Sequence, residues 1–451
     1  MGRKRVYLIV ILLFATLLLR AQSVQDEPVR EEMSSYKILN ISDYSYDELV
    51  DEGIFTLDHQ LEVMHVPFRQ LHFFIKRYIG THHFELNKGK RRVRKTTFRA
   101  IAFAYPSVSP TGEPVMLSAL VTIPVLNGNR PARLLLYHRI LAASNKIAPT
   151  NSMPIEAVLT ADNTICVFPD YYGCGITEGN PLPFVSLNYH AQCATECVLS
   201  ALDIVRDQGI ELDDGFYTWT TGYSQGGGFA LATHRFVETV LPDSLVHRIN
   251  LRWSFCGGGI FTPIELYKSA IQRKEMGSMP AVYLQGLRSL FSGHPECMEG
   301  VTIADFLSEN ALNFGVDSLM NDHDDGLWDL SHRVNSRYES QDPADYFNAL
   351  ALDTSSYLFN KLAVGFGLDD CLNGWQPHAP VVLFHSEKDG CIPYSLAIEA
   401  QRQLSVPSVN QCVLTLPSVQ ASHTVTALFY FSKILRLRED ELYNQYLLPH
   451  K

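Results

Sequence analysis

The segment YTWTTGYSQGGG, residues 217–228, runs from β-forming residues into the pattern Gly-x-Ser-x-Gly, and an apolar segment with helical spacing follows it. This order predicts a strand, a sharp turn and a helix, with Ser224 at the turn. Gly222 and Gly226 suit the turn because a Cβ atom at either position would crowd it. A serine so placed exposes its Oγ, and the next backbone N–H points at a developing oxyanion. The segment therefore predicts acyl-transfer chemistry; the alternative is a glycine-rich turn whose serine only caps a helix.

A serine hydroxyl is a weak nucleophile at neutral pH, so it needs a base, and the base needs an acid that orients it. On a parallel sheet these residues are expected in the order Ser, Asp, His. Asp389 lies in a predicted turn after the buried strand 381–384, and His423 lies in a predicted loop before the last helix. Alone, Asp389 with Gly390 would be an ordinary turn pair and His423 a solvated side chain. Their order and their places at the ends of elements favour a hydrolase.

Strand-like and helix-like segments alternate along most of the chain. The predicted strands cover residues 96–105, 114–125, 133–137, 164–168, 217–221, 250–255, 380–384 and 411–416, and the predicted helices cover 191–206, 227–241, 394–404 and a segment from 424. This alternation predicts an α/β fold with a mainly parallel sheet flanked by helices. Residues 262–375 instead carry helical spacing without strands, so we expect an inserted helical cap over the strand ends, where such folds bind ligands.

We therefore expect a core formed by residues 91–261 and 376–451, interrupted by the cap 262–375. Residues 22–90 are expected to form an N-terminal extension packed on this core. Apolar spacing between residues 281 and 291 favours ordinary helix packing. The alternative is that these side chains, with Leu287 and Leu290 as candidates, roof an acyl pocket.

Residues 1–21 resemble a secretory signal peptide, with a basic start, an apolar run and a small residue, Ala21, before the expected cleavage site. An uncleaved membrane anchor is the alternative, although the apolar run is short for a span of about 20 residues. We therefore expect an exported protein, either secreted or periplasmic. Without this segment 33 basic residues face 48 acidic ones, a net charge of −15, so nucleic acid is a poor partner. The basic run 88–95 is better explained as a solvated strand edge than as an anion site.

The nine cysteines form no CxxC pair and no Cys/His cluster with zinc spacing. No metal site is therefore predicted, and acyl transfer by a serine needs no cofactor. An odd number of cysteines leaves at least one thiol outside any set of disulfides. Cys166 lies in a predicted buried strand, and Cys193 and Cys197 are one helical turn apart, so packing is the expected role of these three.

The segment VFPDYYG, residues 167–173, and the predicted helix that ends in DIVR at 203–206 resemble the secretory lipase group of the α/β-hydrolase superfamily. The resemblance covers roughly residues 96–260 and 377–435. It implies the α/β-hydrolase fold and a catalytic triad. In that triad Ser224 would be the nucleophile, Asp389 the orienting acid and His423 the general base.

The same resemblance implies an oxyanion hole with two backbone donors. One would be the N–H of Gln225, and the other would come from the turn after the strand 134–137. The group's usual His-Gly appears here as His138-Arg139, so either Arg139 or Ile140 would supply the second N–H. His138 itself could act directly or be a packed core histidine.

The sequence therefore predicts an exported serine hydrolase that cleaves carboxylic esters of small molecules or lipids through an acyl-enzyme. A serine peptidase of the prolyl-oligopeptidase kind shares the order of the triad, but the chain shows no propeller repeat. A noncatalytic glycan- or lipid-binding protein on a hydrolase scaffold is the other alternative. It is disfavoured because binding alone does not require all three triad residues.

Overall fold

The structure is a computed structural model, and it describes residues 36–63, 97–125, 130–139, 148–320, 333–334, 340–405, 412–415 and 421–436. The expected signal peptide 1–21 and the basic run 88–95 lie outside these residues. Within the described ranges, no helix combines the length and the apolar character needed to cross a membrane.

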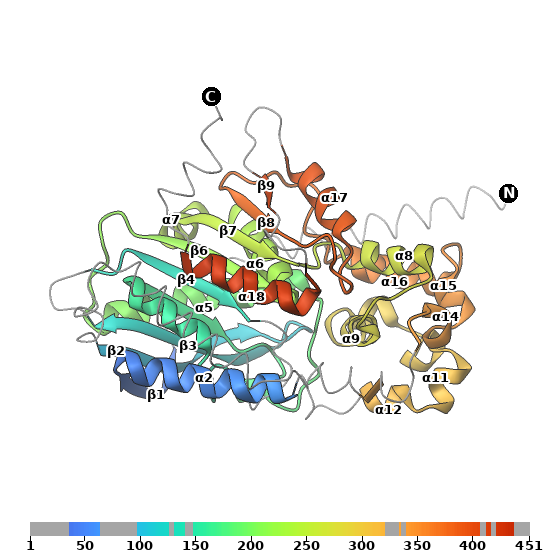
Figure 1. The fold of residues 1–451 in the computed structure, drawn as a ribbon, viewed down its shortest axis with the longest axis horizontal. Helices are drawn as coiled ribbons and strands as arrows, with labels where there is room; N and C mark the ends of the chain where they lie inside the picture. The colour runs from blue at the N-terminus through green and yellow to red at the C-terminus, as the bar shows by residue number, and fades with distance from the viewer. Residues whose placement is uncertain are drawn as a thin grey trace.

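Nine strands of the described chain form one sheet through the centre of the molecule (Figure 1). They are β1 (Lys37–Tyr44), β2 (Thr97–Val108), β3 (Pro114–Val125), β4 (Arg133–His138), β5 (Thr164–Pro169), β6 (Tyr217–Tyr223), β7 (Leu251–Gly257), β8 (Val381–Phe384) and β9 (Cys412–Thr415). Their order in the sheet is β1-β2-β3-β5-β4-β6-β7-β8-β9. The pairs from β1 to β5 are antiparallel, and those from β5 through β4 to β9 are parallel. The predicted mainly parallel sheet is confirmed.

Strand β1 is an edge strand that the sequence did not predict. It pairs with β2 over most of its length, so residues 37–44 belong to the sheet. Its side chains are largely solvent-exposed, including the apolar Leu39 and Ile41. A half-solvated edge lacks the clear apolar alternation by which a strand is recognised, which is why this part of the expected extension was missed.

Helices cover both faces of the sheet. They are α2 (Tyr46–Val63), α5 (Leu187–Asp207), α6 (Gln225–Thr239), α7 (Asp243–Ile249), α17 (Tyr394–Leu404) and α18 (His423–Arg436). Successive side chains of a strand point to opposite faces. In β8, Val381 and Leu383 pack in a cluster with α6 and α17, whereas Val382 and Phe384 pack in a cluster with α18. Burial on both faces explains why the central parallel strands are apolar throughout.

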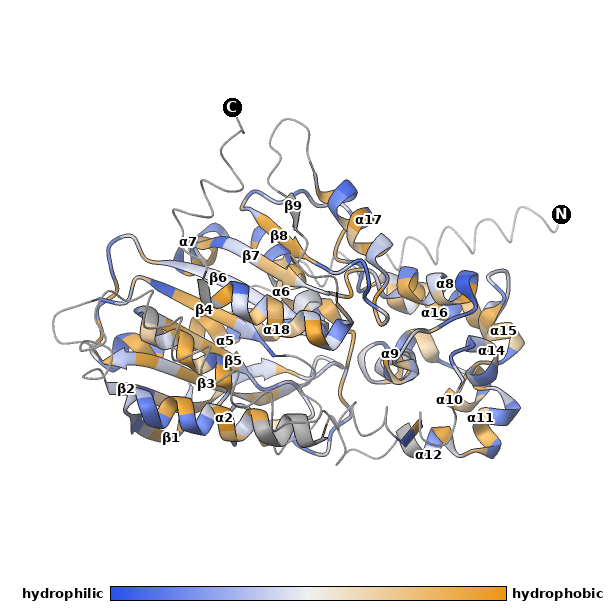
Figure 2. Cartoon of the chain, viewed as in Figure 1, coloured by the Kyte–Doolittle hydropathy of each residue, from blue (hydrophilic) through white to orange (hydrophobic). Residues whose placement is uncertain are grey.

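A group of helices lies beyond one end of the sheet, on the right in Figure 1, between β7 and β8 in the chain. These cap helices are α8 (Pro263–Arg273), α9 (Pro280–Gly293), α10 (Ile303–Phe306), α11 (Glu309–Asn313), α12 (Val316–Met320), α14 (Pro343–Tyr346), α15 (Ala349–Leu352) and α16 (Tyr357–Gly367). Figure 2 shows both apolar and hydrophilic residues on them, as expected for helices with one packed and one solvated side. The predicted inserted helical cap is confirmed.

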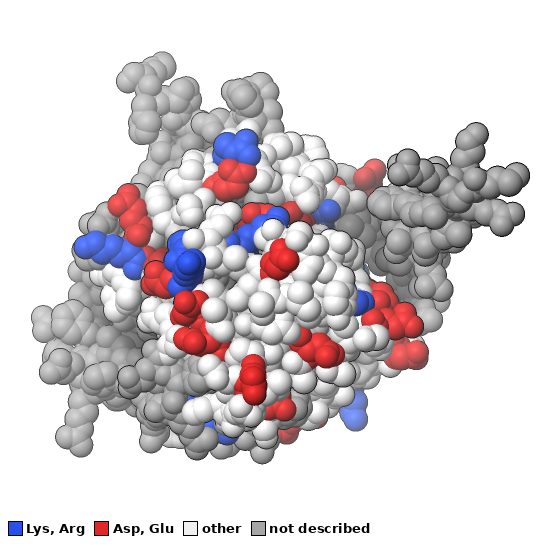
Figure 3. Space-filling model, turned by 90° about the vertical axis from the view of Figure 1, so that its right-hand side faces the viewer, with Lys and Arg blue, Asp and Glu red and all other residues white. Residues whose placement is uncertain are grey.

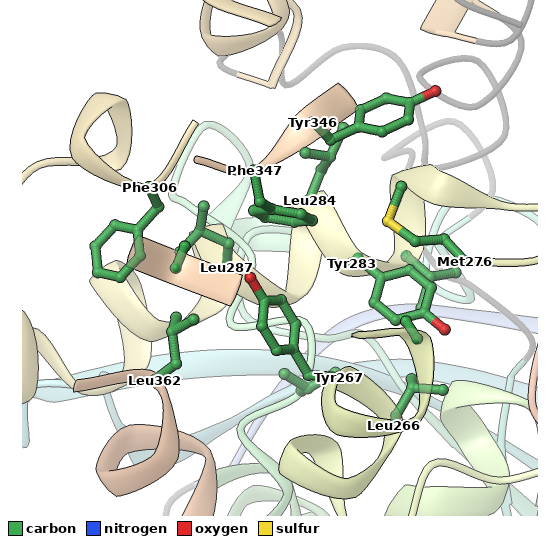
Figure 4. Close-up of a cluster of buried hydrophobic side chains, with 14 of the residues drawn as sticks. Leu266, Tyr267, Met276, Tyr283, Leu284, Leu287, Phe306, Tyr346, Phe347 and Leu362 are labelled. Atoms are coloured by element: carbon green, nitrogen blue, oxygen red, sulfur yellow. The ribbon is translucent and has the colours of Figure 1, made fainter. Parts of the chain in front are cut away.

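The cap has a hydrophobic core of its own, drawn in Figure 4. Leu287 lies there among Tyr267, Phe347 and Leu362, and it is fully buried. Leu290 belongs to the same cluster and is 1% exposed. Both leucines therefore pack in the core of the cap, which agrees with ordinary helix packing as the reason for the apolar spacing of α9.

The outer side of the cap faces the viewer in Figure 3. Acidic and basic side chains are scattered there among uncharged ones, and the basic ones do not gather into a patch among the residues drawn in colour. This side therefore presents a mixed surface with large uncharged areas.

Candidate active site

Ser224 occupies the turn between β6 and α6, as the sequence predicts. Its backbone φ of 58° lies in the left-handed region, which few residues other than glycine adopt. The Ser224 N–H donates a hydrogen bond of 2.8 Å to the Gly257 carbonyl, and the Ser224 carbonyl accepts one of 2.9 Å from the Gly227 N–H. These bonds hold a strained backbone in place, which is a common property of functional turns.

The glycines around Ser224 are required by close backbone contacts. A Cβ on Gly222 would lie 2.4 Å from the Gly226 carbonyl oxygen, and a Cβ on Gly226 would lie 2.2 Å from that of His138. Both distances are far below normal van der Waals contact. Gly226 therefore lets the start of α6 pass directly against the end of β4.

The structure brings Ser224, His423 and Asp389 together. The Oγ of Ser224 lies 2.8 Å from Nε2 of His423, and Nδ1 of His423 lies 2.6 Å from Oδ2 of Asp389. The other carboxylate oxygen accepts the N–H groups of Cys391 at 2.9 Å and Ile392 at 2.8 Å. Because a carboxylate accepts, Nδ1 of His423 is the donor, and Nε2 of the neutral ring is left to accept the Ser224 hydroxyl.

All three side chains are shielded from solvent. Ser224 and His423 are each 5% exposed, and the Asp389 side chain is fully buried. Burial raises the pKa of the Asp389 carboxyl, but the charge and the hydrogen bond of His423 outweigh it and hold this pKa below its usual range. Asp389 therefore stays ionised at neutral pH. An ionised carboxylate can orient an imidazole ring and stabilise its protonated form.

Two further residues join the loops that carry these side chains. Ser386 Oγ donates to the Ala421 carbonyl at 2.8 Å and accepts the Ala421 N–H at 3.1 Å, which links the loop after β8 to the loop before α18. The Tyr223 hydroxyl donates to the His423 carbonyl at 2.8 Å. The sequence did not indicate either residue, because nothing in a single sequence distinguishes them from other loop serines or buried tyrosines.

Gln225 is the first residue of α6, and the first N–H groups of a helix have no intrahelical partner. The Gln225 N–H is therefore a candidate oxyanion donor. Its side chain is buried and donates through Nε2 to the Phe184 carbonyl at 2.7 Å. The side chain thus fixes the start of α6 against the segment before α5.

The second expected donor lies at the end of β4. His138 pairs with Gly222 of β6, so Arg139 follows directly beside the elbow. The Arg139 side chain is 1% exposed. Burial raises the pKa of the Glu156 carboxyl, and the positive charge of Arg139 partly counteracts this. Burial also raises the pKa of the Asp170 carboxyl, which hydrogen bonds from Ser118 and Thr150 counteract more than the charge of Arg139 does. Ile140 lies outside the described residues.

His138 is a core residue. It is 1% exposed, packs edge-on against Phe229, and has Nε2 at 3.3 Å from Thr233 Oγ1. Burial, aided by the neighbouring His190, lowers the His138 pKa to about 3, so the ring is neutral at ordinary pH. This environment fits the packing alternative for His138.

Solved structures with the same architecture were found by comparison. The esterase LipA from Xanthomonas oryzae, described as rice cell wall degrading, is 16% identical with a TM-score of 0.67, over 93% of this chain and 99% of that one. A Legionella pneumophila protein described as a hydrolase is 15% identical with a TM-score of 0.64, over 93% of this chain and 100% of that one. Candida antarctica lipase A is 14% identical with a TM-score of 0.54, over 76% of both chains.

The chain has the α/β-hydrolase fold. No family model matches its sequence, and the comparison with curated proteins finds no match. At identities this low the likeness shows the fold, and it does not show the activity.

Proposed function

We propose that this protein is a serine hydrolase that cleaves carboxylic esters through an acyl-enzyme. The observation that carries the proposal is the continuous hydrogen-bond chain from Ser224 Oγ through His423 to Asp389. Its members follow β6, β8 and β9 at the same edge of the sheet, where α/β folds bind their ligands. A noncatalytic binding protein has no need of this arrangement.

The geometry supports the following reaction. Ser224 Oγ attacks the ester carbonyl carbon while its proton passes to Nε2 of His423, and Asp389 stabilises the imidazolium that forms. The N–H of Gln225 and one from Arg139 or Ile140 would stabilise the negative carbonyl oxygen. His423 then returns the proton to the leaving alcohol oxygen as the carbon–oxygen bond breaks. Water, activated by His423, releases the acid from Ser224 in the reverse sequence.

We propose that the cap determines which substrates the enzyme accepts. The Ser278 N–H, in the inserted segment, donates to the Gly390 carbonyl at 2.9 Å. Gly390 directly follows Asp389, so the insertion reaches the loop that carries the acid. We therefore place the acyl group of the substrate beneath the cap. We also propose that the protein is exported, which the basic and apolar residues of the segment 1–21 support. The esterase and the lipase among the similar structures support an ester as the substrate.

A fluorophosphonate probe tests this function, because it reacts with activated serine nucleophiles and leaves ordinary serines unmodified. We expect the wild-type protein to be labelled and Ser224→Ala to remain unlabelled. A panel of esters of increasing chain length and of aminoacyl amides then separates esterase from peptidase. Hydrolysis of the amides at rates equal to the esters would contradict the ester specificity, and a wild-type protein without labelling would contradict the serine mechanism.

A further inference from the structure

Tyr430 lies on α18, roughly two turns after His423, and its side chain is 2% exposed. Its hydroxyl donates to the Phe255 carbonyl at 2.7 Å and accepts the Gly222 N–H at 3.2 Å. It also forms a short hydrogen bond with the Thr221 hydroxyl. One side-chain oxygen therefore contacts the backbone of two different strands.

These strands are neighbours in the sheet. Thr221 of β6 lies opposite Phe255 of β7, and Gly222 lies opposite Cys256. The Tyr430 hydroxyl thus bridges the two strands in the last part of their pairing, two residues before Ser224. The hydroxyl therefore adds hydrogen bonds to Gly222 and Phe255 beside the pairing of the two strands.

The tyrosine ring is held on several sides, which fixes where its hydroxyl lies. It packs against Tyr223 and Phe384 with ring centroids 5.5 Å apart in both pairs. A Cβ on Gly257 would lie 2.7 Å from its Cδ2. The ring therefore has little freedom to move away from the strand ends.

The same helix begins with His423, so α18 connects the proposed base to the strand that carries the nucleophile. We infer that Tyr430 is a positioning residue, which sets the distance between Ser224 Oγ and His423 Nε2 by tying α18 to the ends of β6 and β7. This inference rests on the proposed serine mechanism. The Ser224 backbone is strained at φ 58°, and such a conformation persists only where its surroundings hold it.

Removal of the hydroxyl leaves the ring in place but removes its hydrogen bonds to Thr221, Gly222 and Phe255. The hold of α18 on the ends of β6 and β7 is then weaker, so His423 at the start of the helix can shift relative to Ser224. A displacement of about 1 Å in a reacting group can cost on the order of 10²-fold in rate. We therefore expect Tyr430→Phe to lower kcat about 10- to 100-fold while KM changes less than about twofold.

The test uses the full-length protein and a short activated ester, with fluorophosphonate inactivation and urea unfolding as parallel measurements. Thr218→Val is the matched control. Thr218 is a buried residue at the other end of β6, and its hydroxyl donates to the Ile249 carbonyl at 2.5 Å. Both variants should unfold at lower urea concentration than the wild type. Only Tyr430→Phe should lose kcat and inactivation rate.

A kcat loss in Tyr430→Phe no larger than in Thr218→Val overturns the inference. If Tyr430→Phe does not fold, Thr221→Val decides, because it removes only the hydroxyl partner of Tyr430. We expect Thr221→Val to lower kcat about 3- to 10-fold, and an unchanged kcat overturns the inference. A wild-type protein that fails to label at Ser224 overturns the proposed function and the inference with it, whereas normal labelling with an unaffected Tyr430→Phe overturns the inference alone.

Discussion

Nε2 of His423 lies 2.8 Å from Oγ of Ser224, although the two residues are 199 positions apart in the chain. The topology of the sheet explains this contact, because parallel strands bring their carboxyl ends, and the loops that follow them, to one edge. Asp389 follows β8 at the same edge. The contact is therefore a consequence of strand order, and its chemistry depends on how firmly the three loops are held.

Asp389, and not Asp369, is expected to orient His423. Asp389→Asn should lower kcat about 10³- to 10⁴-fold, because the amide stabilises the wrong imidazole tautomer. Asp369 is the control, since its carboxylate binds His294 Nε2 at 2.7 Å and accepts the Asn188 N–H at 3.1 Å, between the cap and the start of α5. Steady-state kinetics on both asparagine variants checks this. A severe loss in Asp369→Asn together with a mild one in Asp389→Asn would reverse the assignment.

Glu238 should make folding stability depend on acid. It accepts hydrogen bonds from His234 Nε2, Trp375 Nε1 and the N–H of Ala379. Burial raises its pKa, but these bonds and the charge of His234 outweigh burial and lower the pKa from 4.5 to about 2. The stabilisation is therefore fully present above about pH 4.5 and is lost as the pH falls toward 2.

The wild type should lose on the order of 2 kcal/mol of unfolding free energy from this group between pH 5 and pH 3. Urea unfolding at several pH values measures the loss. Glu238→Gln should be less stable at pH 7 and should show a correspondingly flatter acid dependence. Parallel curves for the two proteins would show that Glu238 does not contribute in this way.

Leu287 should stabilise the cap. It is fully buried in the cap core, so Leu287→Ala should lower the unfolding free energy by about 2–5 kcal/mol. Leu350, in the same cap, is 48% exposed, and Leu350→Ala should change stability by less than about 0.5 kcal/mol. Equal effects in denaturant unfolding would argue against the packing described for α9.

Gly286 offers a test of where the acyl group binds. It lines a small apolar cavity between α8, α9 and α16, together with Val185, Tyr267 and Phe366. A Cβ on Gly286 would lie 3.7 Å from Phe366 Cζ, an ordinary contact, so a modest side chain fits there. Gly286→Val should reduce turnover of longer acyl esters more than that of acetyl esters, with Gly286→Ala intermediate. An unchanged chain-length profile would place the acyl group elsewhere.

The sequence predicted the core and the three candidate catalytic residues because their signals are local. Ser224 lies in a short pattern with a strand before it and a helix after it. Asp389 lies in the turn after a predicted strand, and His423 lies in the loop before the last predicted helix. The residues that hold them could not be predicted in this way. Tyr430 and Thr221 are 209 positions apart, and their contact follows from the docking of α18 on the sheet.

The short cap helices could be predicted from the sequence only in part. Ser308, Asp342, Asn348 and Ser356 each begin a helix and accept a backbone N–H from its first turn. Such N-cap residues are visible in a sequence, so the starts of α11, α14, α15 and α16 were accessible. Their packing into one cap core was not, because it depends on contacts between helices distant in the chain.

Trapping of the acyl-enzyme would identify the nucleophile. The protein would be mixed with an activated ester, quenched in acid within the first turnovers, and digested for mass spectrometry. We expect an acyl mass on the peptide that contains Ser224, and none in Ser224→Ala. An acyl group on another residue, or ester turnover that persists in Ser224→Ala, would contradict this assignment.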